Sequence, residues 1–216
     1  ISMLIVCLFS AALNTPTLLT SSSILLIALL TQPFTALIST NVNMHYSMVR
    51  NNKVSSIFKD KIIPVRVKVR FVLIGCIGAF CAISAALFIL LIDTPSIKHS
   101  IVFSDLINYN KAPHSTRTLL NDPAVPTITT LAILIVHIIN AHEALCVNGF
   151  SIKKNPIAAF SLVLSLVLFL AFTEIPFLRS LSGLCHLSIK RWIVAIVLCL
   201  PVYLVNLVIR IVFREK

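Results

Sequence analysis

The chain contains the stretch Trp192-Ile-Val-Ala-Ile-Val-Leu-Cys-Leu-Pro201-Val-Tyr-Leu, and Arg210 and Arg214 follow it. An α-helix needs about twenty consecutive apolar residues to cross the hydrocarbon core of a bilayer, which is about 30 Å thick. Basic residues beside such a stretch are typical of the cytoplasmic end of a span. We therefore predict that this stretch is a transmembrane helix that ends in the cytosol.

The composition of the whole chain agrees with this prediction. Of its residues, 58% are hydrophobic and 12% are charged, and the mean hydropathy is +1.00. A chain with this balance cannot fold as a water-soluble globule, and it lacks the alternating pattern of membrane β-barrels. We expect an all-α membrane protein in which residues 1–216 form a single membrane domain, a bundle of six transmembrane helices with antiparallel neighbours. The predicted spans are residues 2–13, 18–39, 71–92, 128–146, 157–172 and 192–212.

The first predicted span is too short to cross a bilayer, and the chain starts with Ile1 instead of Met. We expect that this helix has lost its beginning and that the sequence is a fragment. Removal of a signal peptide is the alternative, although a mature chain that starts inside an apolar run would be unusual.

The basic residues predict the orientation of the spans, because Lys and Arg near span ends are retained in the cytosol. Residues 40–70 form a basic loop and are assigned to the cytosol. Alternation then places residues 93–127 in a lumenal or external loop and the C-terminus in the cytosol. The net charge of +11 is explained by this topology and by attraction to anionic headgroups of the lipid bilayer, so no nucleic-acid partner is expected. The basic residues of the cytosolic loop are Arg50, Lys53, Lys59, Lys61, Arg66, Lys68 and Arg70.

The sequence contains no catalytic motif for ATP hydrolysis. It has only four glycines and no phosphate-binding loop, and Asp60-Lys61 continues as Ile-Ile where a phosphorylated-aspartate ATPase needs Thr-Gly. We expect no catalytic residue and no cofactor in this chain, which cannot hydrolyse ATP alone. The cysteines lack metal-ligand spacing and lie mostly in apolar spans, so we interpret them as small buried hydrophobic residues and expect no metal site. They are Cys7, Cys76, Cys81, Cys146, Cys185 and Cys199.

The fourth span carries polar side chains near the middle of the bilayer. His137 lies near its centre, and Asn140 follows on the same helical face. A polar or ionisable group at this depth is costly, which favours a role in an ion pathway. The alternative is structural hydrogen bonding, because one backbone carbonyl or a neighbouring helix would satisfy a neutral imidazole.

The third span carries a stripe of small residues. Gly75, Gly78 and Ala82 recur on this helix, and side chains of this size let a second backbone approach closely. We predict a role in helix packing for this stripe.

These features together resemble the last six transmembrane helices of calcium-type P-type ATPases of the reticulum and of the Golgi secretory pathway. The final span is similar in its Trp192, in Pro201 nine residues later, and in the basic residues that follow. The segment from Pro176-Phe-Leu-Arg-Ser180 to Trp192 is similar to an outer loop of the Golgi pumps. The resemblance covers essentially the whole chain.

Other segments resemble the same family in the same order. They are Ser10-Ala-Ala-Leu13 and Pro33-Phe-Thr-Ala-Leu37 for the first two spans, the Gly-containing third span, and Asp122-Pro-Ala-Val-Pro-Thr-Ile-Thr-Thr with Asn140-Ala141 around the fourth.

The resemblance implies the transport half of a cation pump. In that family the phosphorylation and nucleotide domains precede the fifth transmembrane helix, so ATP and magnesium would bind in an N-terminal part that this chain lacks. The partners would be those missing domains and a transported cation. The chain would be an integral, multi-pass protein of an endomembrane, reticulum or Golgi, or of the plasma membrane.

The ion ligands of the calcium pumps are not preserved. Calcium needs six to eight oxygen ligands, several of them carboxylate. The positions that match the family's ligands hold Met3, Leu26, Leu29, Leu30 and His137. Calcium transport through the usual ligand set is therefore not expected.

The second span offers a different polar group of residues. Pro33 removes a backbone donor and frees carbonyls on the preceding turn, and Thr31 and Gln32 precede it. These groups would line a polar pocket that faces His137 and suits a proton, a monovalent cation or a non-ionic head group. A plain proline kink is the alternative.

Three functions stay open on the sequence alone. The first is the membrane half of a divergent cation pump. The second is a non-transporting, pump-derived scaffold or regulatory protein. The third is an unrelated multi-span transporter whose Trp192 and Pro201 spacing is accidental. The broad resemblance favours the first.

Overall fold

The computed structural model describes residues 1–12, 18–40, 65–90, 121–147 and 156–212. Within these ranges every regular element is a helix and no strand is present, so the prediction of an all-helical chain is confirmed there. The helices are α1 (Ser2–Ala12), α2 (Ser21–Thr40), α4 (Val65–Phe88), α7 (Ala124–Val147), α8 (Pro156–Glu174), α9 (Pro176–Ser182) and α10 (Ile189–Val212).

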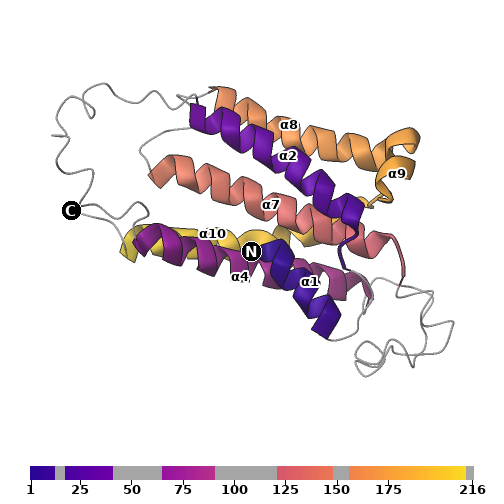
Figure 1. The fold of residues 1–216 in the computed structure, drawn as a ribbon, viewed down its shortest axis with the longest axis horizontal. Helices are drawn as coiled ribbons and strands as arrows, with labels where there is room; N and C mark the ends of the chain where they lie inside the picture. The colour runs from indigo at the N-terminus through magenta and orange to yellow at the C-terminus, as the bar shows by residue number, and fades with distance from the viewer. Residues whose placement is uncertain (13–17, 41–64, 91–120, 148–155, 213–216) are drawn as a thin grey trace.

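The long helices lie side by side (Figure 1). α8 and α2 form one edge of the assembly in this view, α7 runs through the middle, and α4 and α10 lie along the other edge with α1 against α4. α7 contacts α2, α4 and α10. It is therefore the helix around which the others are arranged.

Three helices of the described part are long and apolar enough to cross a membrane, namely Val69–Phe88, Ala124–Glu143 and Ile189–Ile209. α8 and α9 meet the same criterion only as a pair, and their axes are bent by 93°. Two other apolar helices, Ser2–Ala12 and Ser21–Thr31, are shorter. A bundle of six spans is thus not confirmed by the described residues.

Several helix boundaries differ from the prediction. α4 begins at Val65 instead of residue 71, so the last residues of the predicted cytosolic loop are helical. Polar residues can extend a helix beyond the hydrocarbon core, and apolar length does not detect such an extension. The rest of that loop, and most of the predicted loop 93–127, lie outside the described residues.

α9 was not predicted, although its ends carry helix signals. Pro176 occupies the first turn, and Gly183 ends the helix in the left-handed conformation with φ of 67°. The Gly183 N–H donates to the carbonyl of Arg179 at 2.9 Å. A helix of seven residues has only about two turns, too few for a clear period in the spacing of its apolar residues. This segment was therefore predicted as a loop.

The core lies between α4, α7 and α10. Side chains of α7 from Ala124 to Leu134 are all buried, which is typical of a helix with neighbours on every side. α4 contributes small buried residues, which let the helices approach closely. These are Ala79, Ala82, Ala85 and Ala86.

α10 presents one narrow stripe to this core. Its buried residues recur at alternating spacings of three and four, the spacing of helices that pack side by side. Trp192, which lies at the start of this stripe, packs edge to face against Phe169 of α8 with ring centroids 5.9 Å apart. α10 continues as a helix through Pro201, which is exposed. The buried residues are Ala195, Cys199, Val202, Asn206 and Ile209.

Candidate functional site

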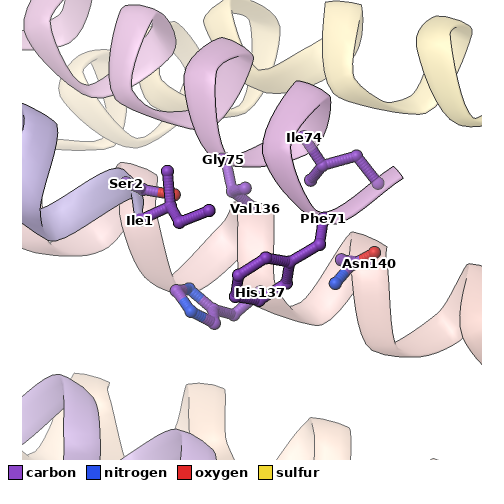
Figure 2. Close-up of a pocket in the computed structure, with 8 residues that line it drawn as sticks. All are labelled: Ile1, Ser2, Phe71, Ile74, Gly75, Val136, His137 and Asn140. Atoms are coloured by element: carbon purple, nitrogen blue, oxygen red, sulfur yellow. The ribbon is translucent and has the colours of Figure 1, made fainter. Parts of the chain in front are cut away.

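A small cavity lies where α1, α4 and α7 meet (Figure 2). Its volume is about 70 Å³, and roughly 10–15 Å³ of such volume is enough to hold one water molecule. The space is therefore large enough for water. The lining residues are Ile1, Ser2, Phe71, Ile74, Gly75, Val136, His137 and Asn140.

Two glycines of α4 allow this close meeting of helices. A Cβ atom on Gly78 would lie 2.8 Å from Cγ1 of Val136 and 3.1 Å from Oγ of Ser2. A Cβ atom on Gly75 would lie 2.5 Å from Cγ2 of Ile1. The packing role predicted for Gly75, Gly78 and Ala82 stays a prediction, and these distances give it a physical basis.

His137 projects from α7 into this cavity (Figure 2). Its Nδ1 lies 2.8 Å from the carbonyl oxygen of Ile133, one turn earlier. A carbonyl only accepts hydrogen bonds, so Nδ1 carries a hydrogen and, in the neutral ring, Nε2 has a free lone pair. This bond is the backbone contact that a structural role would require, and it leaves one nitrogen able to accept a proton.

Asn140 borders the same cavity and is bonded to α4. Its backbone carbonyl and its Oδ1 accept hydrogen bonds from Nη2 of Arg70 at 3.3 Å and 3.2 Å. The guanidinium therefore places a positive charge beside the cavity. Arg70 was predicted only as a charge of the cytosolic loop, and no local pattern in the sequence predicts this contact, because the two residues are far apart in the chain.

The electrostatic character of the cavity follows from its lining. None of the described residues that line it is acidic, while Arg70 lies at its border. Divalent cations need several oxygen ligands with negative charge. This cavity is therefore a poor site for calcium.

The structure does not bring Thr31 into the cavity. Its hydroxyl donates to the carbonyl of Ile27 on its own helix at 2.8 Å, and Thr31 is not among the lining residues. The side chains of Gln32 and Pro33 lie outside the described part. Whether these three residues form a polar pocket therefore stays a prediction.

Of the five positions that we expect to match the pumps' ligands, four hold apolar residues and the fifth holds His137. Leu26 and Leu30 are buried, Leu29 is exposed, and Met3 is half-buried against the core. Among the described residues, no group of three or more His, Cys, Asp or Glu side chains could hold a metal ion.

Two buried polar side chains of the helices were not among the predicted site residues. Asn206 is 3% exposed, and within the described residues neither its Oδ1 nor its Nδ2 has a hydrogen-bond partner. Glu143 is buried near the end of α7, with its carboxylate 3.6 Å from Nδ1 of His142. For both residues, the only signal in the sequence is a polar side chain within or at the end of an apolar run.

Residues 183–188, which join α9 to α10, make polar contacts with α7 and α8. The Cys185 N–H donates to Oγ1 of Thr127 on α7 at 3.0 Å. Nδ1 of His186 lies 2.8 Å from a carboxylate oxygen of Glu174 at the end of α8. Burial raises the pKa of the Cys185 thiol, so that thiol stays protonated and unreactive at neutral pH.

The sequence was compared with known proteins. The model of one protein family, described as the C-terminus of cation transporting ATPases, matches residues 16–212. No curated protein matches the chain.

Proposed function

The chain belongs to the family of the C-terminal region of cation transporting ATPases, and from this we propose that it is the membrane-embedded transport half of a divergent P-type pump of the calcium-pump-like kind. The observation that carries the proposal is the length of the match, which extends over residues 16–212. The match includes α2 and every described helix after it. The apolar helices support a location in a membrane.

The cavity at His137 is our candidate for part of the ion pathway. His137 offers a lone pair on Nε2, because Nδ1 is bonded to the Ile133 carbonyl. The cavity lacks a carboxylate, and Arg70 lies beside it. These features favour a proton over a divalent cation as the transported or counter-transported species. Asn140 would position Arg70, and Thr31 with Gln32 would belong to a separate part of the pathway.

The remaining parts of the pump are also proposed. ATP, magnesium and the phosphorylated aspartate would belong to N-terminal domains that this chain lacks, and those domains would be its partners. The complete protein would act as an ATP-driven cation translocase with six spans in this region. It would lie in the reticulum, the Golgi or the plasma membrane, with its C-terminus in the cytosol.

The first test of this proposal is the transcript upstream of Ile1. An in-frame Asp-Lys-Thr-Gly followed by a nucleotide-binding region is the expected result, since both precede the transport half in P-type pumps. An initiator Met directly before Ile1 would contradict the proposal.

The His137 assignment is tested separately. We expect His137→Leu to abolish ATP-driven transport by the complete protein in sealed vesicles, because the side chain that accepts the proton is lost, while membrane insertion is retained. Ile138→Leu, a half-buried neighbour on the same helix, is the matched control and should transport normally. Unchanged transport by His137→Leu would exclude this residue from the pathway.

One observation favours a second candidate function. The positions that the resemblance matches to the pumps' ligands hold Met3, Leu26, Leu29, Leu30 and His137, and none of these side chains supplies an oxygen ligand for calcium. A pump-derived scaffold or regulatory protein that no longer transports would keep the helices and lose these ligands. Complete protein that inserts in the membrane but shows no ion-dependent ATP hydrolysis would favour this candidate.

A further inference from the structure

The bend between α8 and α9 sets the direction of the shorter helix. α8 is apolar and ends at Glu174, and the axis of α9 is turned by 93° from it. A helix at a right angle to a span runs along the membrane surface and not through the bilayer. α9 has seven residues and at 1.5 Å per residue is only about 10 Å long. It lies across one end of the bundle (Figure 1).

α9 exposes large apolar side chains on one face. Phe177 is 73% exposed and Leu181 is 69% exposed, and residues four apart lie on the same side of a helix. Ile175, at the bend, is 47% exposed. The opposite face packs against the bundle, where Ser182 is buried. An apolar face of this kind marks a contact with a membrane or a partner.

The exposed surface of α8 indicates that the apolar face of α9 contacts a membrane and not a protein partner. Val163, Val167 and Leu170 are exposed along α8 and recur at spacings of four and three, so they form one apolar stripe. On a helix that spans a bilayer this stripe faces lipid. The next position at this spacing is Glu174, where α8 ends, and the exposed apolar residues Ile175 and Phe177 follow it directly in the chain. The apolar surface of α9 therefore begins where the stripe of the span ends.

The polar groups at the bend between α8 and α9 are bonded within the protein. Nε of Arg179 donates to the carbonyl of Thr173 at 2.9 Å, and Nη2 donates to the carbonyl of Glu174 at 3.1 Å. The Glu174 carboxylate contacts His186. These charged groups lie at the level where a span leaves the hydrocarbon, and Arg179 reaches back to the end of α8. Such a helix, with apolar residues on one face and bonded polar groups on another, is typical of the membrane interface.

We propose that α9 is an interfacial helix whose Phe177 and Leu181 side chains insert into the lipid, at the boundary between headgroups and acyl chains of the leaflet at the Glu174 end of α8. This proposal does not depend on transport. It assigns the surface to lipid and not to a protein partner.

The test uses fluorescence, because the sequence contains a single tryptophan. The full chain carrying Trp192→Phe, which keeps an aromatic ring against Phe169, is the background. Phe177→Trp or Leu181→Trp is added, and the protein is reconstituted in phosphatidylcholine vesicles. Some vesicles contain lipid brominated near the headgroup, and others contain lipid brominated near the chain end. Because both positions are exposed, neither substitution disturbs the core.

We expect both tryptophans to lose most of their fluorescence to the lipid brominated near the headgroup, and to be protected from acrylamide in the water. Val167→Trp is the control for depth and should be quenched more by the lipid brominated near the chain end. Free N-acetyltryptophanamide in the same buffer is the control for water and should be quenched strongly by acrylamide.

Three results would overturn the proposal. Quenching of both tryptophans by acrylamide alone would place the face in water. Protection from acrylamide and from both brominated lipids would place it against protein. Stronger quenching by the lipid brominated near the chain end would place α9 inside the hydrocarbon, as part of a re-entrant segment.

Discussion

Gly78 determines how closely α7 can approach α4. Any larger side chain would meet Val136 and Ser2, because even a Cβ atom would lie 2.8 Å from Cγ1 of Val136. We expect Gly78→Leu to lower the free energy of unfolding by about 1–3 kcal/mol, the usual cost of overpacking. Thermal unfolding in detergent micelles measures this change. Phe80→Leu, on the exposed side of α4, is the control, and equal stability of the two variants would contradict the packing role.

Asn206 has an amide that is buried without a partner in the described part of the chain. Burying an unpaired polar group costs about 1–3 kcal/mol. We therefore expect Asn206→Leu, which has a similar volume, to raise the midpoint of thermal unfolding. Leu207→Ile, at the exposed neighbouring position, should leave the midpoint unchanged. A lower midpoint for Asn206→Leu would mean that the amide has a hydrogen-bond partner in the folded protein.

The residues of the cavity illustrate what a sequence can predict about a site. His137 and Asn140 were found because polar residues are unusual in an apolar run, and the structure places both at one cavity. Arg70 was missed because its contact with Asn140 depends on how α4 is placed against α7. Thr31 was expected near His137, but the described structure bonds its hydroxyl to its own helix. Periodicity identifies a helix but not its rotation relative to its neighbours.

Among the elements, α9 depends on the conformation of the residue that follows it. Gly183 has φ of 67°, and an added Cβ would have nothing within 4 Å. The cost of a substitution is therefore conformational and not steric against neighbours, about 1 kcal/mol or slightly more. We expect Gly183→Ala to destabilise the protein by this amount and Gly183→Asn by less, because Asn tolerates the left-handed region. Chemical unfolding of both variants measures the difference, and equal costs would contradict this explanation.

The lengths of the helices show why their ends were harder to predict than their existence. Trp192 was predicted to begin the last span, and α10 begins at Ile189. Lys190 and Arg191 interrupt the apolar run and are nevertheless helical. A helix can continue into the headgroup region, where charged side chains are solvated, so the limits of the hydrocarbon and of the helix do not coincide.

For the molecule as a whole, the distribution of charge predicts its orientation. Residues 93–127 are expected on the lumenal side, and Lys153 and Lys154 on the cytosolic side. A glycosylation acceptor inserted after Lys111 should be glycosylated in microsomes, whereas one inserted after Lys154 should not, because the enzyme acts only in the lumen. The electrophoretic shift measures the modification. The reverse pattern would invert the predicted topology.

The whole assembly also depends on α7, in which three threonines and His137 are bonded within their own helix. Thr127, Thr129 and Thr130 each donate to a carbonyl one turn earlier, at 2.7, 2.8 and 2.6 Å, and His137 contacts Ile133 in the same way. During synthesis α7 enters the membrane before α10 has been translated. The hydroxyls of these threonines are therefore already satisfied before α10 is present, and they add no unpaired polar group to α7 in the lipid. α10 contains the amide of Asn206, which has no partner among the described residues. It is synthesised after α4 and α7, so both are already present for it to pack against.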